Sequence, residues 1–110
     1  MDTKEANVII EQYMYPKAVI NSYRAESLLY NVSWNKLMKV VQKIVSQDLS
    51  SISINYGTGC TDSFAYCTIK WDIGDKKFIT TGNINEDNQS LIMAVFNSVV
   101  QFIQWYNNEQ

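Results

Sequence analysis

The stretch Ser51-Ile52-Ser53-Ile54-Asn55-Tyr56 alternates polar and apolar side chains without a break. Successive side chains of a β-strand point to opposite faces, so this pattern predicts a strand that presents Ile52, Ile54 and Tyr56 to a core. A second alternating run covers residues 64–73, and a third covers residues 77–81. The core side of the second run is expected to carry Ala65, Cys67, Ile69, Trp71 and Ile73.

The two connections between these runs differ in length and composition. Gly74-Asp75 is a two-residue turn signal and predicts a tight hairpin between the second and third strands. The longer connection, Gly57-Thr58-Gly59-Cys60-Thr61-Asp62-Ser63, begins like a dinucleotide-binding fingerprint. Asp62 takes the place of the third glycine, and a strand follows where a helix belongs, so we interpret this segment as a hairpin tip. If the protein binds a small ligand, the candidate loop is Tyr56, Gly57, Thr58, Gly59 and Cys60.

Helical patterns precede and follow the strands. Ser33 is a good N-cap, and an amphipathic helix is predicted to follow it from about Trp34 to Asp48. A longer helix is predicted from about Glu86 to Asn107, with Asn85 as its cap. A shorter helix, residues 6–15, is expected to stop before Pro16, because the residue before a proline disfavours helical geometry. Residues 17–32 show no clear period, and one interpretation makes residues 27–30 extended.

This order of elements predicts an α+β fold in a single domain spanning residues 1–110. The expected architecture is a two-layer sandwich. A three-stranded antiparallel meander is covered on one face by the two long helices, and the short N-terminal helix lies beside them. The uncovered face of the sheet is expected to be polar and to present Ser51, Ser53, Tyr66, Thr68 and Lys70.

The final helix has an apolar face roughly twice as wide as the ~100° stripe that a surface helix needs. Two explanations are open. The N-terminal helix packs over one flank through Val8, Ile9, Ile10 and Tyr13. Alternatively, the flank is a homodimer or docking surface for another protein, centred on Phe96, Val100 and Trp105, since aromatic anchors are enriched at such interfaces.

The composition disfavours several classes of function. The chain has no histidine, which removes the commonest general base, the Cys-His and Ser-His nucleophile pairs and most catalytic zinc sites. Cys60 and Cys67 are expected to be free thiols, with a disulfide between them as the alternative. No metal or cofactor is expected, because Asp72, Asp75 and the acidic residues near position 86 are explained by turn solubility and helix capping.

Charge and hydropathy point to a cytoplasmic protein that binds neither membranes nor nucleic acids. The formal net charge is −2, which argues against a large phosphate-binding surface, and no run approaches the ~20 apolar residues of a membrane span. The lysines of the first long helix, at positions 36, 39 and 43, lie on its polar face. We favour a solvated helix face over a surface for an acidic partner.

Two strings resemble motifs of small proteins from Bacteroidetes and their phages. Residues 30–44 read YNVSWNKLMKVVQKI and resemble Y-x-x-S-W-D/N-x-L-M-x-V-V-x-K-I, and residues 95–107 read VFNSVVQFIQWYN and resemble V-Y/F-x-x-V-V-x-F-I-x-W-Y-N. The two matches have the order and separation of that family and cover about a quarter of the chain. The resemblance implies an α/β sandwich in a bacterial or phage cytoplasm and supplies no chemistry.

The sequence therefore predicts a non-enzymatic accessory protein, like those of phages or mobile elements, that acts through protein–protein contact and self-associates. The alternative is a sequestering module for a small ligand or nucleotide that uses the tip from Tyr56 to Asp62.

Overall fold

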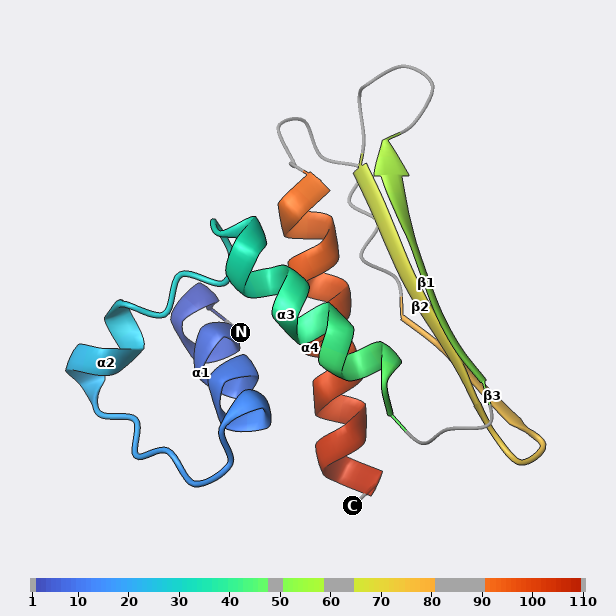
Figure 1. Ribbon diagram of the computed structural model, residues 1–110, viewed down its shortest axis with the longest axis horizontal. Helices are drawn as coiled ribbons and strands as arrows, with labels where there is room; N and C mark the ends of the chain where they lie inside the picture. The colour runs from blue at the N-terminus through green and yellow to red at the C-terminus, as the bar shows by residue number, and fades with distance from the viewer. Residues whose placement is uncertain (1, 48–50, 59–64, 81–90, 110) are drawn as a thin grey trace.

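A computed structural model describes residues 2–47, 51–58, 65–80 and 91–109 (Figure 1). The elements are α1 (Thr3–Met14), α2 (Ser22–Glu26), α3 (Trp34–Val45), β1 (Ser51–Thr58), β2 (Ala65–Ile73), β3 (Lys76–Ile79) and α4 (Leu91–Glu109). Among these residues, no helix has both the length and the apolar character needed to cross a membrane.

The three strands form one antiparallel sheet in the order β1-β2-β3, as the alternating pattern predicts. Gly74 turns between β2 and β3 with a φ of +60°, which favours glycine because it has no Cβ. The β2 residues predicted to face the core are buried from Ala65 to Trp71, and Ile73, the last of them, is exposed. The meander and its tight hairpin are confirmed.

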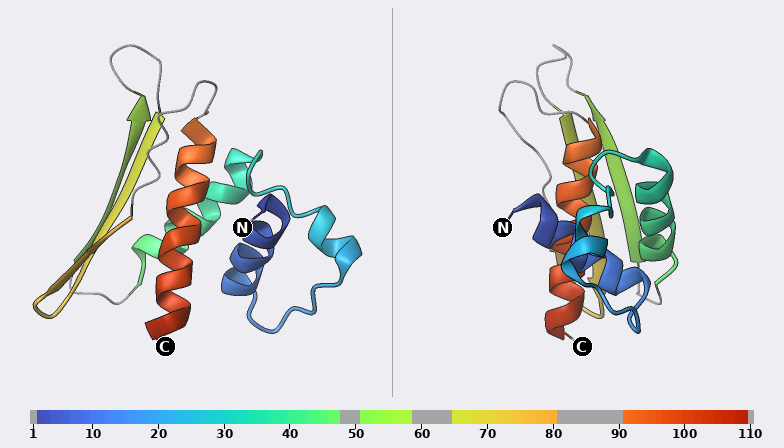
Figure 2. Two further views of the ribbon diagram at one scale, coloured as in Figure 1. Left: turned by 180° about the vertical axis from the view of Figure 1, so that it is seen from behind. Right: turned by 90° about the vertical axis from the view of Figure 1, so that its left-hand side faces the viewer.

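Helix α4 lies at the centre of the molecule, between the sheet and α1 (Figures 1 and 2). On the sheet side, Phe102 contacts Trp71 edge-on with ring centroids 4.9 Å apart, and Trp105 lies against both Trp71 and Phe78. Helix α3 packs beside α4 and against β1. The predicted α+β class, with a sheet covered on one face by helices, is confirmed.

The far side of α4 is covered by α1. Tyr13 packs edge-on against Tyr106 at 5.4 Å between ring centroids, and Ile10 is completely buried. The wide apolar face of the last helix is therefore shared between the sheet on one side and α1 on the other, which is the first of the two explanations offered by the sequence.

The helix ends follow the sequence signals where they are described. Ser33 caps α3 by accepting a hydrogen bond from the Lys36 backbone N–H at 3.3 Å, and α1 ends at Met14, two residues before Pro16. The extended segment considered for residues 27–30 is wrong, because Leu29 adopts a left-handed φ of 53° and a turn follows. The predicted cap and first turn of the last helix, residues 85–87, lie outside the described residues.

Residues 15–32, the arm, leave the end of α1, form α2 at the outer limit of the molecule and return to α3 (Figure 1). The arm buries Leu28 and Tyr30 in the core and is also attached by polar contacts. The Asn7 side chain accepts a hydrogen bond from the Tyr30 backbone N–H at 3.0 Å, and Glu11 accepts one from the Tyr30 hydroxyl at 2.7 Å. Glu11 also forms an ion pair with Arg24 at 3.2 Å.

Candidate functional site

The two edge strands of the sheet differ in the features by which natural proteins prevent unwanted strand pairing. Free edges are commonly kept short or carry charged residues, especially lysine, or proline. β3 has four residues, two of which are Lys76 and Lys77. β1 has eight residues and contains no charged residue and no proline. One edge of the sheet is thus protected against further pairing, and the other is not.

The hydrogen-bonding direction of β1 follows from contacts on the opposite side of the sheet. The Thr80 N–H donates to the Ile69 carbonyl at 2.9 Å, and the Ile69 N–H donates to the Thr80 hydroxyl at 3.0 Å, so the backbone of Ile69 turns toward β3. The direction of the backbone N–H and C=O groups alternates from one residue to the next along an antiparallel strand. These groups of the even-numbered residues of β2 therefore point toward β1. Their partners in β1 are Ser51, Ser53, Asn55 and Gly57.

The remaining residues of β1, including Ile52, Ile54 and Tyr56, therefore direct their N–H and C=O groups to the open edge. Within the described part of the chain, no hydrogen bond from another element reaches these groups. An unpaired row of this kind is a template for an additional strand. We define the outward backbone of these three residues as the β1 edge.

Apolar side chains border the β1 edge on its helix side. Trp34, at the start of α3, lies next to Tyr56 with ring centroids 6.3 Å apart, and the two side chains are 39% and 43% exposed. Val45, at the other end of α3, is 41% exposed. An added strand would find apolar surface beside the Tyr56 end of β1.

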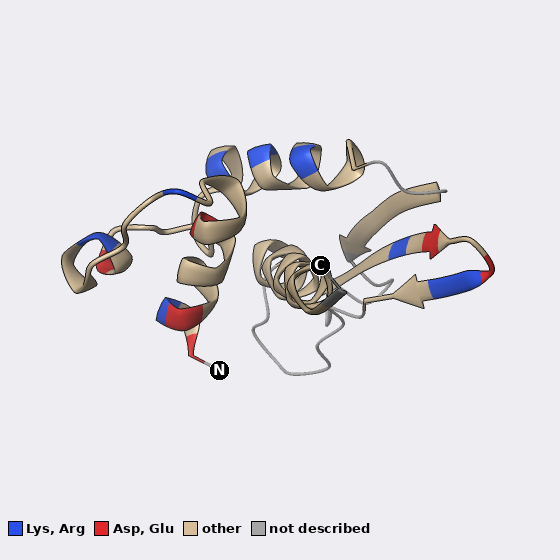
Figure 3. Cartoon of the chain, turned by 90° about the horizontal axis from the view of Figure 1, so that it is seen from below, with Lys and Arg blue, Asp and Glu red and all other residues tan. Residues whose placement is uncertain are grey.

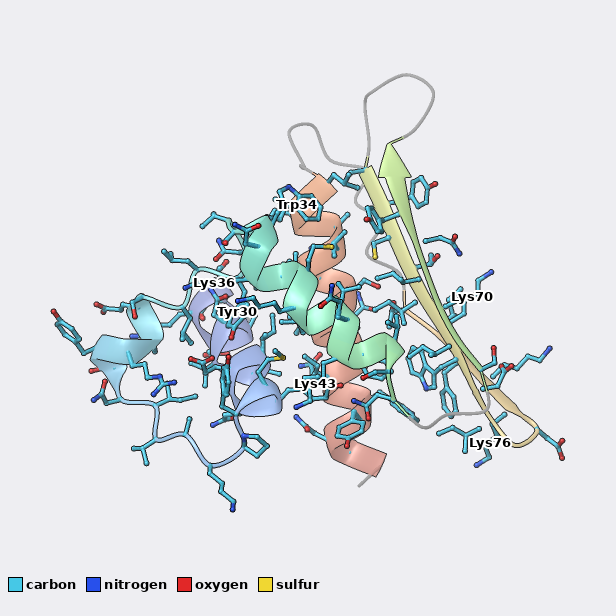
Figure 4. All side chains as sticks on the ribbon, viewed as in Figure 1. Tyr30, Trp34, Lys36, Lys43, Lys70 and Lys76 are labelled. Carbon is cyan, nitrogen blue, oxygen red and sulfur yellow. The ribbon has the colours of Figure 1, made fainter. Side chains whose placement is uncertain are left out.

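The opposite face of the sheet is polar, as predicted. Lys70 projects from this face away from the helices (Figure 4), and its neighbours across the strands are Ser53 and Ile79. A shallow depression of about 450 Å³ is lined here by Ser51, Ser53, Lys70, Asp72, Lys77 and Ile79, among others. Ser51, Ser53 and Lys70 are exposed, whereas Tyr66 and Thr68 are half-buried.

The predicted partner surface on the last helix is not open. Phe96 and Val100 are 2% and 6% exposed, and Trp105 packs against Trp71 and Phe78 of the sheet. The expectation that these three residues centre an accessible interface is therefore corrected: the chain's own elements cover the helix. The periodicity of a helix gives the width of its apolar face and does not identify what covers it.

The predicted ligand loop is only partly described. Tyr56 is exposed, Gly57 and Thr58 are the last residues of β1, and Gly59 and Cys60 lie outside the described residues. The Tyr66 ring approaches Gly57 so closely that a Cβ there would lie 3.0 Å from its hydroxyl oxygen. Cys67 is a free thiol, and burial raises its pKa, so it is not an activated nucleophile.

The lysines of α3 lie along one side of the helix (Figure 3), and two of them have structural partners. Lys36 donates to the Leu28 carbonyl at 3.2 Å, and Lys43 donates to the Tyr13 carbonyl at 2.6 Å. Lys39 is exposed and lines a polar cavity of about 320 Å³ together with Glu11 and Arg24. This face therefore fastens α1 and the arm to α3, in addition to being solvated.

No protein-family model, no curated protein and no solved structure matches this chain. Within the described residues, no group of three or more cysteine, aspartate or glutamate side chains is arranged to hold a metal ion. The candidate site is therefore defined by geometry alone. Sequence reasoning did not identify the β1 edge, although its signal was present: in a meander the first strand is an edge, and this one carries no charge.

Proposed function

We propose that this protein is a non-enzymatic interaction module that binds another polypeptide by adding a strand to the β1 edge. The observation that carries this proposal is the contrast between the unprotected β1 and the short, lysine-bearing β3. In strand addition, backbone hydrogen bonds supply affinity and alternate side chains supply specificity. An accessory role in a bacterial or phage cytoplasm, implied by the motif resemblance, belongs to the same proposal.

The partner segment that suits this edge is extended and alternates in polarity. Its side chains on the helix side would lie near Trp34 and Tyr56, which favours apolar residues. Those on the opposite side would lie beside Ser53 and Asn55, which favours small polar residues. The absence of histidine from the chain supports a binding role over acid–base catalysis.

Amide hydrogen exchange with a strand-forming peptide tests this proposal. The probe is a synthetic capped peptide with the sequence SISINYGT, added in excess to dilute isotope-labelled protein. We expect slower exchange at the amides of Ile52, Ile54 and Tyr56 and unchanged exchange at Ser53 and Asn55, which already bond to β2. The control is the same peptide with a central proline. Equal exchange rates with and without the first peptide would contradict the proposal.

A second candidate is a planar small ligand, such as a nucleotide, held by the exposed Trp34 and Tyr56 rings. Two partly exposed aromatic rings at one end of a sheet can bind an aromatic ligand by stacking. A tight ligand must raise the melting temperature, so thermal-shift measurements with nucleotides and cyclic dinucleotides test this function. Trp34→Phe is the control, since it should weaken any true response. A flat response across the panel would exclude this function for those ligands.

A further inference from the structure

We infer that the strand accepted by the β1 edge is β1 of a second copy of this chain, paired antiparallel about a two-fold axis. The inference rests on the proposed function, because it names the partner for the same edge. The product would be a continuous six-stranded sheet in the order β3-β2-β1-β1-β2-β3.

The register of this pair is limited by the direction of the backbone groups. Outward residues can hydrogen-bond only to outward residues of the second copy, so even-numbered positions must face even-numbered positions. Placing Ile54 on the axis satisfies this condition and sets Ile52 opposite Tyr56 of the second copy. Ser53 then lies opposite Asn55. Apolar residues meet on the helix side, and small polar residues meet on the open side.

Charge favours self-pairing at this edge and opposes it at the other. β1 contains no charged residue, so no like charges face each other in a β1–β1 pair. A β3–β3 pair would bring Lys76 and Lys77 close to the same lysines of the other copy, which is destabilising. Because each copy has one unprotected edge, the two-fold pairing uses both and leaves only protected edges. The assembly therefore closes at two copies instead of growing into a fibre.

The exposed apolar residues of α3 fit the same arrangement. α3 runs beside β1 with Trp34 near Tyr56, and its other end leads into the start of β1. In an antiparallel pair, the Tyr56 end of one copy lies beside the Ser51 end of the other. Trp34 and Tyr56 would thus approach the Val45 end of the second copy, and the three exposed side chains would become buried.

Sedimentation velocity over a range of concentrations tests the inference with a variant designed to leave the single chain intact. In Ser53→Glu/Asn55→Glu, the carboxylate introduced at position 53 lies opposite Lys70 within the sheet, which favours the folded monomer. In the β1–β1 pair, each introduced carboxylate faces another carboxylate. We expect a concentration-dependent dimer for the natural sequence and dimerisation weakened about tenfold or more in the variant.

The matched control is Gln12→Glu/Asn107→Glu, which adds the same charge at two exposed helix positions away from β1. We expect it to dimerise like the natural sequence. Equal weakening of both variants would assign the effect to net charge and overturn the inference. If the double β1 variant does not fold, amide exchange of the natural sequence still decides, because the amides of Ile52, Ile54 and Tyr56 must become protected as the dimer forms.

The remaining outcomes separate this inference from the proposed function. A dimer in which these three amides stay unprotected would overturn the β1–β1 pairing. The chain could instead stay monomeric at every concentration while the SISINYGT peptide protects the three amides. This result would overturn the inference that the partner is a second copy, and it would still support the β1 edge as a site that accepts a strand. A monomer that ignores the peptide would overturn both.

Discussion

The two sides of α4 are held by different kinds of contact. On the sheet side, Trp71, Phe78, Phe102 and Trp105 form one aromatic cluster within the apolar core. On the far side, α1 makes apolar contacts with α4, and the arm beyond it buries Leu28 and Tyr30 but is also held by hydrogen bonds to the side chains of Asn7 and Glu11. Apolar burial is distributed over many atoms, whereas a buried hydrogen bond depends on a single partner.

This difference means that the two regions should fail in different ways. Loss of one large side chain in the aromatic cluster should lower the stability of the whole chain. Loss of one polar group under the arm should release residues 15–32 and leave the sheet in place.

Phe102→Ala should remove about 3–5 kcal/mol from the free energy of unfolding, because Phe102 is fully buried against Trp71 and leaves a cavity. Urea titration followed by circular dichroism measures the loss. Ile79→Ala serves as the control, since Ile79 is 58% exposed and should change stability by less than about 0.5 kcal/mol. Similar losses in both variants would contradict the assignment of the core.

Asn7→Ala should cost about 1–3 kcal/mol locally, because it removes the acceptor for the buried Tyr30 N–H and the contact with Asn31. Amide exchange should accelerate across residues 22–31 and stay unchanged at Ile69. Lys4→Ala is the control, since its ion pair with Glu26 joins two exposed side chains and contributes little. Uniform acceleration throughout the chain would show that the arm and the sheet unfold together.

High pH should weaken the far side of α4. Burial, with a smaller contribution from Tyr106, raises the pKa of Tyr13 to about 12, and burial and Glu11 also raise the pKa of Tyr30. The unfolded chain releases these protons first, so this stabilisation is complete below pH ~10 and is lost as the pH rises toward 12, by about 1 kcal/mol per pH unit for each tyrosine. Urea unfolding between pH 9 and 11.5 measures the slope, and Tyr13→Phe should reduce it to about half, because Tyr30 still contributes. An equal slope in that variant would exclude Tyr13 as the cause.

Lys43→Met should have the smallest effect, about 0.5–1.5 kcal/mol, because it removes the hydrogen bond to the Tyr13 carbonyl and the charge over the Tyr13 ring but keeps the aliphatic stem. Lys39→Met, on the same helix, should be nearly neutral, since Lys39 is exposed. Melting temperatures compare the two variants directly. A larger loss for Lys39→Met would mean that this lysine has a structural role in the cavity that it lines with Glu11 and Arg24.

The sequence predicts what depends on local pattern and fails where contacts connect distant residues. The hairpin follows from alternation and from Gly74-Asp75, and α3 follows from Ser33 and its period. The arm could not be predicted, because its position depends on hydrogen bonds between α1 and residues 19 to 24 positions later. The partner surface was misplaced for the same reason: Phe96 and Val100 are covered by parts of the chain that are remote in sequence.

The position of α4 has a consequence for how the chain folds. The sheet, α3 and α1 all pack against a helix that follows them in the sequence, and Tyr13 contacts Tyr106 across most of the chain's length. The contacts that join α1 and α3 to the sheet through α4 cannot form before residues 91–109 have been synthesised, and the loops that they close are long. Topologies with such distant contacts fold slowly. A nascent chain that ends before α4 would expose Ile69, Trp71 and the unprotected strand together, which is a state prone to aggregation on the ribosome.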